Sequence, residues 1–230
     1  MSRCIKSEDI VKNFEKYVRR QDLARFLARY ELFKKIIDIK GSIVECGVHE
    51  GRGIFSWAKL SSNLEPYAIH RKIIGFDTFE GFPSIDERDL SIQIENPRLR
   101  KGGFEEDYDV YSECLSLTEE YDSNRFLNQF DKIKLIRGDA LKTIPEFVEK
   151  NRHLTISLLF LDFDLYEPTK AALKYLAPLV VKGGIIAFDE VNNENWPGES
   201  EALKEYFNYN LNQVELKKFY FDPNISYYIV

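Results

Sequence analysis

The chain has 230 residues, of which 44% are hydrophobic and 30% are charged, and its formal net charge at pH 7 is −6. This length suits one α/β domain with an appendage, and the acidic balance gives no general attraction to nucleic acid. No apolar run approaches the roughly 18 residues of a membrane span, so we expect a soluble protein that is not held in a membrane.

The N-terminus and the cysteines bear on where the protein works. No apolar signal region follows Met1, which disfavours secretion and makes the cytoplasm the expected location. The three cysteines, Cys4, Cys46 and Cys114, are scattered and form no C-x-x-C pair. This pattern predicts reduced thiols rather than a zinc knuckle or a disulfide framework.

The first 40 residues are predicted to be helical. From Ile10 to Ile37 apolar residues recur at three- and four-residue steps, which indicates one or two amphipathic helices. We treat residues 1–40 as a helical appendage that packs on a sheet or on a second subunit, so a homodimer is plausible. Four arginines cluster between Ile10 and Ile37: Arg19, Arg20, Arg25 and Arg29. A solvated face is the favoured interpretation of these arginines, and an anion-binding role is the alternative.

A glycine-rich turn at residues 41–53 organises the domain that follows. An apolar run ends at Glu45, three glycines follow, and apolar residues at helical spacing begin at Ile54, as in a strand, a turn and a helix. The glycines, Gly47, Gly51 and Gly53, let backbone N–H groups approach a ligand closely. Their order is G-x-x-x-G-x-G, not the G-x-G-x-x-G of dinucleotide sites.

The acid before this turn indicates which ligand it would hold. Glu45 would repel a pyrophosphate but attract a cationic ammonium group, which S-adenosylmethionine carries. The glycines alone are equally consistent with a plain strand-to-helix turn.

Two further strands end in candidate cofactor ligands. The strand at residues 72–77 ends in Asp77, an acid placed to accept ribose hydroxyls, with loop capping as the alternative. The strand at residues 132–136 leads to Asp139, which could hydrogen-bond an adenine amine or equally cap the next helix. Between these strands, residues 84–128 are polar, aromatic and irregular, and we predict that part of this insert forms a lid.

Four acids follow the last two central strands. Residues 156–162 are nearly all apolar, as in a parallel strand buried on both faces, and residues 185–190 form the next strand. The acids at their ends are Asp162, Asp164, Asp189 and Glu190. Such strand ends meet at one edge of a sheet, where four carboxylates would repel one another unless a cation such as Mg²⁺ binds them. Separate helix caps are the less favoured alternative.

The end of the chain completes an α/β pattern. Residues 170–181 are predicted to form a helix that stops at Gly183 and Gly184, and residues 201–207 another. Residues 214–221 and 225–230 read as a terminal hairpin. We therefore predict a mostly parallel sheet with an antiparallel C-terminal hairpin, in a domain spanning residues 41–230.

Several of these segments, taken together, resemble one enzyme family. They are Ile43–Val48 with the glycine turn, Phe76–Pro83, Leu161–Thr169, Gly183–Asp189 and Trp196–Gly198. In this order they resemble the macrocin O-methyltransferase family over about residues 41–207, and the D-x-D-L-Y-x-x-T block is the most distinctive piece. The resemblance implies a Rossmann-like class I S-adenosylmethionine-dependent fold with a seven-stranded sheet, a divalent cation, and methylation of a sugar hydroxyl.

The resemblance also assigns roles by position. Asp162, Asp189 and Glu190 look like the metal ligands, and Asp164 looks like the general base, with Asp162 counted beside it as catalytic. The expected cofactor-binding set is Glu45, Gly47, Gly51, Asp77, Thr78, Asp139 and Ala140. Two positions depart from the family pattern. Phe163 stands where the family usually has Gly and would reshape the sugar pocket, and Glu190 replaces a second Asp but can still ligate Mg²⁺.

Other functions remain as alternatives. The acceptor could be a non-sugar vicinal diol or catechol-like metabolite, because the same ligands would serve. A non-catalytic nucleotide-binding subunit would have no reason to keep four acids at the strand ends. A nicotinamide-dependent enzyme is disfavoured, since the chain has neither the G-x-G-x-x-G turn nor a Tyr-x-x-x-Lys pair in a suitable helix. His49 is expected to be a turn residue rather than a catalytic one.

Overall fold

The computed structural model describes residues 7–230, so Cys4 and the first part of the predicted appendage lie outside the described residues. The strands are β1 (Ser42–Cys46), β2 (Ile73–Asp77), β3 (Ile133–Arg137), β4 (Ile156–Leu161), β5 (Val180–Phe188), β6 (Lys217–Lys218) and β7 (Ser226–Ile229). The α-helices are α1 (Ser7–Lys12), α2 (Phe14–Tyr17), α3 (Arg20–Ile36), α4 (Arg52–Leu64), α5 (Val110–Ser123), α6 (Ala140–Lys150), α7 (Tyr166–Tyr175) and α8 (Pro197–Tyr206). Three short 3₁₀ turns are η1 (Glu87–Asp89), η2 (Ala177–Leu179) and η3 (Leu211–Gln213).

The strands form one seven-stranded sheet in the order β3-β2-β1-β4-β5-β7-β6. The pairs from β3 to β5 are parallel, whereas β7 runs antiparallel to β5 and to β6. This confirms the predicted mostly parallel sheet and its antiparallel C-terminal hairpin. The strand order reverses between β1 and β4, and in such sheets ligands bind beyond the carboxyl ends of the strands at that reversal.

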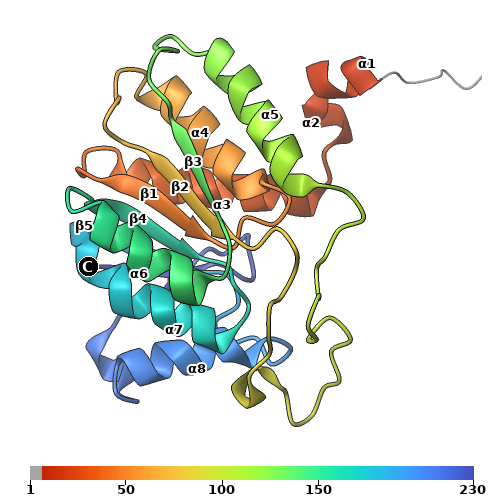
Figure 1. The fold of residues 1–230 in the computed structure, drawn as a ribbon, viewed down its shortest axis with the longest axis vertical. Helices are drawn as coiled ribbons and strands as arrows, with labels where there is room; N and C mark the ends of the chain where they lie inside the picture. The colour runs from red at the N-terminus through yellow and green to blue at the C-terminus, as the bar shows by residue number, and fades with distance from the viewer. Residues whose placement is uncertain (1–6) are drawn as a thin grey trace, which may run out of the picture.

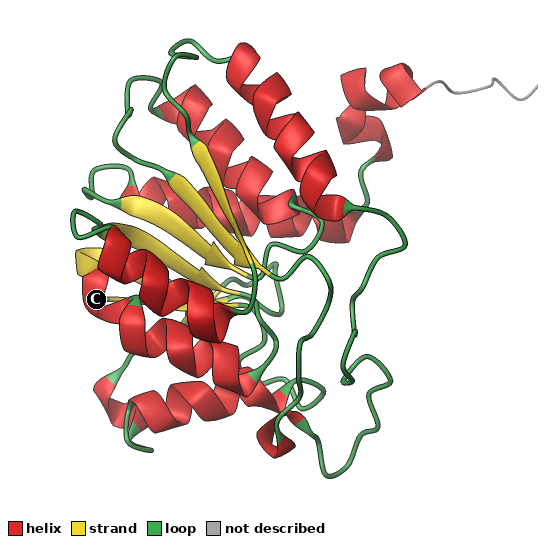
Figure 2. Cartoon of the chain, in the orientation of Figure 1, coloured by secondary structure: helices red, strands yellow, loops and turns green. Residues whose placement is uncertain are grey.

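Helices cover both faces of the sheet (Figures 1 and 2). On one face α6, α7 and α8 bury side chains such as Phe147 and Leu173 against Val44. On the other face α3 and α4 bury Phe33 and Trp57. Successive residues of β1 serve opposite layers, because side chains alternate along a strand. Burial of one large apolar side chain stabilises the fold by about 1.5–3 kcal/mol, so these two layers hold the site-bearing helices firmly in place.

Helix α3 packs on the sheet and its end is tied to the domain. Leu32 and Phe33 are fully buried in the core shared with α4. Arg71 donates hydrogen bonds of 3.1 and 2.9 Å to the carbonyls of Ile36 and Ile39, at the end of the helix. Of the two packing modes predicted for this segment, the structure shows contact with the sheet, while the division at residue 40 and a homodimer stay predictions.

Two local expectations differ from the structure. Residues 110–123, expected in an irregular insert, form helix α5, and the Tyr121 hydroxyl donates a 2.6 Å hydrogen bond to the Ala58 carbonyl of α4. Gly183 and Gly184, expected to stop a helix, lie inside β5, because α7 ends earlier and η2 turns the chain into the strand. Within residues 7–230, no helix has both the length and the apolar character that crossing a membrane requires.

Candidate active site

A cavity of about 380 Å³ opens at the carboxyl edge of the sheet, where the strand order reverses. The predicted residues that line it are Glu45, Gly47, Asp77, Thr78, Asp139, Ala140, Asp162, Asp164, Asp189 and Glu190. Gly51 is not among the lining residues; it precedes α4 with a φ of 83° and shapes the turn. The topology therefore gathers residues that lie more than 140 positions apart in the sequence.

Close packing of β1 against β4 explains the first glycine of the turn. Gly47 has a φ of 94°, and a Cβ atom there would lie 1.9 Å from the carbonyl oxygen of Asp162. A side chain at this position would be strained and would collide with backbone. Gly47 thus lets the turn and the acidic strand end of β4 lie side by side.

Asp77 holds the glycine turn in shape. Its carboxylate accepts hydrogen bonds from the backbone N–H groups of Val48 at 2.7 Å, His49 at 2.8 Å and Phe79 at 2.7 Å. This is the loop-capping role that the sequence left as an alternative. Asp77 also lines the cavity, and its contact with a ribose stays a prediction.

Asp139, which follows β3, and Thr78, which follows β2, also make hydrogen bonds within the protein. Asp139 caps α6 and accepts a 3.0 Å hydrogen bond from the N–H of Leu141. Thr78 donates from its hydroxyl to the Gly81 carbonyl at 2.6 Å and so closes the turn after β2. Both side chains line the cavity, and their contacts with a cofactor stay predictions.

Glu45 lines the cavity and is buried, with 1% of its surface exposed. Its carboxylate accepts a 2.6 Å hydrogen bond from Trp57 Nε1 of α4. A Cβ on Gly53 would lie 2.0 Å from Glu45 Oε1, so glycine is needed where α4 passes this acid. Burial raises the pKa of Glu45 to about 7, although the Arg29 charge and the Trp57 hydrogen bond oppose the shift.

The four acids after β4 and β5 share one charged environment. Burial raises the pKa of Asp162 to about 6, and burial together with the Asp162 charge raises that of Asp189 to about 8. The pKa of Glu190 rises to about 7 through burial and the neighbouring Asp189. Asp164 has a left-handed φ of 62°, and burial followed by the Asp162 charge raises its pKa well above the ordinary range. Burial and mutual repulsion therefore favour the protonated forms of these carboxyls at higher pH than is usual for Asp and Glu.

Two arginines of α3 enter this acidic region, whereas the sequence favoured a solvated face and kept anion binding as the alternative. Arg25 forms an ion pair with Asp189, and its Nη1 atom lies 3.8 Å from Asp222 Oδ1. Arg29 is 7% exposed and lies over the ring of Phe160, 5.7 Å from its centroid. The expected solvated face is wrong for these two residues. The available signal was their four-residue spacing, which puts both on one side of the helix.

The two other arginines of this segment, Arg19 and Arg20, are exposed as expected.

Glu199 of α8 is a further acid that the sequence did not single out. It is fully buried, and its carboxylate accepts a hydrogen bond from the N–H of Glu190. Burial, reinforced by the charge of Asp189, raises its pKa well above the ordinary range. Its Oε1 atom and Oδ1 of Asp189 are buried without a hydrogen-bond partner among the described residues. Nothing in the sequence around Glu199 distinguishes it from an ordinary first-turn acid.

The predicted metal ligands fit a divalent cation in their chemistry. Asp162, Asp189 and Glu190 offer hard carboxylate oxygens, and the partnerless Asp189 oxygen is free to accept a ligand. In the structure, however, the ion pair with Arg25 supplies part of the balancing charge. Across residues 7–230, the group with three donor atoms mutually within 4.8 Å is His49, Glu50 and Glu106, and not this trio. The trio stays a predicted metal site.

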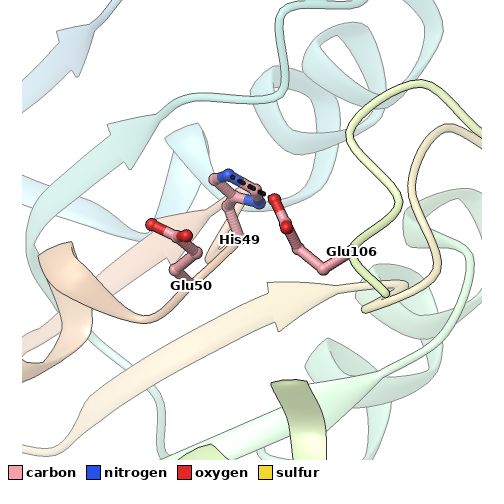
Figure 3. A group of neighbouring side chains, drawn as sticks. All are labelled: His49, Glu50 and Glu106. Atoms are coloured by element: carbon pink, nitrogen blue, oxygen red, sulfur yellow. Dashed lines mark ion pairs between the residues drawn. The ribbon is translucent and has the colours of Figure 1, made fainter. Parts of the chain in front are cut away.

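The segment between β2 and α5 closes over one side of the cavity. Figure 3 shows Glu106 of this segment beside His49, with 3.7 Å between Glu106 Oε1 and His49 Nε2, and Glu50 next to them. Phe104 packs edge-on against His49 and stacks on Trp196, with centroids 5.5 and 5.6 Å apart. These contacts join the glycine turn, the insert and the loop after β5. They place the insert where the predicted lid would act, and its opening and closing stay a prediction.

The sheet, the glycine turn and the acids at the strand ends define a class I methyltransferase. The family described as Macrocin-O-methyltransferase (TylF) matches residues 19–222. The chain belongs to this family and is an O-methyltransferase.

Solved structures agree with this assignment. The crystal structure of CalS11, a calicheamicin methyltransferase, is 32% identical with a TM-score of 0.92, and the match covers 99% of this chain and 86% of that one. An apo structure of CalS11, described as a TDP-rhamnose 3'-O-methyltransferase, is 30% identical with a TM-score of 0.81, covering 99% and 88%. The O-methyltransferase NovP, at 20% identity and a TM-score of 0.65 over 90% and 79%, supports the fold. A comparison with curated proteins finds no match.

Proposed function

We propose that this enzyme transfers the methyl group of S-adenosylmethionine to a hydroxyl of a sugar, carried by a glycosylated or nucleotide-linked small molecule. The observation that carries the proposal is a single cavity lined by both the acid-flanked glycine turn and the acids after β4 and β5. The likeness to CalS11, described as acting on TDP-rhamnose, supports a sugar as the acceptor.

S-adenosylmethionine would bind at the glycine turn and at the ends of the neighbouring strands. Glu45 would accept the ammonium group of the donor, because a buried carboxylate gains most from a cationic partner. Asp77 and Thr78 would meet the ribose, and Asp139 with the backbone of Ala140 would meet the adenine. Each of these residues lines the cavity, and the strands that contain or precede them, β1, β2 and β3, are neighbours in the sheet, which supports the proposal.

The sugar hydroxyl that accepts the methyl group would bind beside the acids after β4 and β5. Asp162, Asp189 and Glu190 would hold a divalent cation such as Mg²⁺, which when bound lowers the pKa of an acceptor hydroxyl. Asp164 would then take the hydroxyl proton as the oxygen attacks the methyl carbon and the carbon–sulfur bond breaks, leaving S-adenosylhomocysteine. Burial raises the pKa of Asp164, so the charge of the bound cation would be needed to keep this carboxyl deprotonated until it accepts the proton. Phe163 lines the cavity between the two aspartates and would contact the sugar.

Calorimetric titration with S-adenosylhomocysteine and, separately, with NAD, each with and without Mg²⁺, tests the cofactor assignment. We expect S-adenosylhomocysteine to bind and NAD not to bind. Binding of NAD alone would overturn the proposal. Methyl-transfer assays with nucleotide-linked sugars and with catechol-like diols would then identify the acceptor, and activity on diols alone would refute the sugar assignment.

A further inference from the structure

Arg29 is a buried cation whose guanidinium lacks a hydrogen-bonded anion. Only 7% of the residue is exposed, and its Nε atom has no hydrogen-bond partner within the described part of the chain. Across residues 7–230, its recorded charge contact is with the face of Phe160 on β4, 5.7 Å away. Burying a guanidinium is costly unless an anion and hydrogen bonds compensate for the lost water. Such a group inside a cavity indicates a binding site for an anionic ligand.

The surroundings of Arg29 indicate which charges this ligand carries. Arg29 and Glu45 line the same cavity, and no ion pair within 4.0 Å joins them. Arg29 still acts on this acid at longer range, because its charge opposes the upward pKa shift of Glu45. Glu45 in turn has one hydrogen-bond donor, Trp57, and room to accept another. A cation and an acid that face one cavity without pairing are complementary to a zwitterion.

A phosphate would suit this position poorly. Besides Glu45, the acids Asp162 and Asp189 lie near enough for the charge of Arg29 to lower their pKa values. A dianion placed on Arg29 would be repelled by these neighbouring carboxylates. An amino-acid carboxylate carries one negative charge and brings its own ammonium, which the acids attract.

We propose that Arg29 binds the α-carboxylate of the methyl donor while Glu45 binds its α-ammonium group. This inference rests on the proposed use of S-adenosylmethionine and adds a residue of α3 to its binding site. The planar guanidinium can hold a carboxylate through two parallel N–H···O bonds. Helix α3 is fixed on the sheet by Leu32 and Phe33, so the guanidinium is positioned before the ligand arrives.

Two ligands that differ in the amino-acid end give a direct test. S-adenosylhomocysteine has this end and 5′-methylthioadenosine lacks it, while both have the nucleoside. We expect Arg29→Met to lower the affinity for S-adenosylhomocysteine about 10- to 100-fold, as for loss of a charge-assisted hydrogen bond. The affinity for 5′-methylthioadenosine should change less than about 2-fold. Arg20→Met, at an exposed arginine of the same helix, is the control and should change neither affinity.

Each calorimetric outcome decides the inference. An equal loss of affinity for both ligands would show that Arg29 only supports the fold of the site. Unchanged affinity for both would exclude contact between Arg29 and the carboxylate. If Arg29→Met does not fold by circular dichroism, Arg29→Lys keeps the charge without the forked donors and should weaken S-adenosylhomocysteine selectively. If the wild-type enzyme binds 5′-methylthioadenosine as tightly as S-adenosylhomocysteine, the nucleoside site stands and this inference fails. If it binds neither, the proposed function fails.

Discussion

Replacing Asp77 by alanine tests the account of how the cofactor turn is held. The side chain accepts three backbone hydrogen bonds, from Val48, His49 and Phe79, at 2.7 to 2.8 Å. Alanine removes all three hydrogen bonds at once. The glycine turn would then be held to the end of β2 by backbone contacts such as the 2.9 Å hydrogen bond from the Gly47 N–H to the Phe76 carbonyl.

The loss of unfolding free energy expected for Asp77→Ala follows from these three hydrogen bonds. A hydrogen bond to a charged group stabilises a protein by about 1.5–3 kcal/mol when buried, and less where water can replace it. Asp77 is half-buried, so we assign about 1 kcal/mol to each bond and expect Asp77→Ala to lower the free energy of unfolding by about 3 kcal/mol. Asparagine keeps one acceptor oxygen and should cost roughly half as much.

Urea unfolding of the ligand-free protein measures this change. Asp109→Ala is a suitable control, because this exposed N-cap of α5 accepts one backbone hydrogen bond, from Ser112 at 3.0 Å. Its loss should cost about 1 kcal/mol. If Asp77→Ala destabilises the protein no more than the control does, the turn does not depend on Asp77. Asp77→Asn also tests the ribose contact, since it should weaken S-adenosylhomocysteine binding beyond what its stability change explains.

Three further experiments probe the acidic edge. Gly47→Ala should destabilise the protein by more than about 2 kcal/mol in urea unfolding, because the positive φ alone costs about 1–2 kcal/mol and the new Cβ meets the backbone of Asp162; unchanged stability would contradict this. Arg25→Met should tighten Mn²⁺ binding in calorimetry, because the guanidinium no longer pairs with Asp189, and weaker binding would show that Arg25 does not compete with the metal. Without metal, the free energy of unfolding should fall as pH rises from about 5 to about 8, because the raised pKa values of Asp189 and Glu190 keep protons on the folded protein that the unfolded chain has already lost. Melts in EDTA and in Mg²⁺ check this, and stability that rises with pH would refute it.

The sequence predicts the parts of the site that depend on the sheet alone. Asp77, Asp162 and Asp189 could be placed together because each ends or directly follows a strand, and parallel strands bring their carboxyl ends to one edge. Gly47 was predicted as a turn glycine that lets backbone N–H groups approach a ligand, and the structure adds its close packing against Asp162. These inferences need only local patterns and the topology. They do not need the packing of side chains from distant helices.

The residues that escaped prediction are those contributed by helices whose orientation the sequence does not fix. Arg25 and Arg29 could equally have faced water, because their spacing defines a helix face but not what that face meets. Once α3 packs on the sheet, both charges enter an edge where the acids would otherwise repel one another. The N-terminal helix therefore contributes to the electrostatics of the site as well as to the core, and a substitution on its inner face should affect ligand binding even where stability is unchanged.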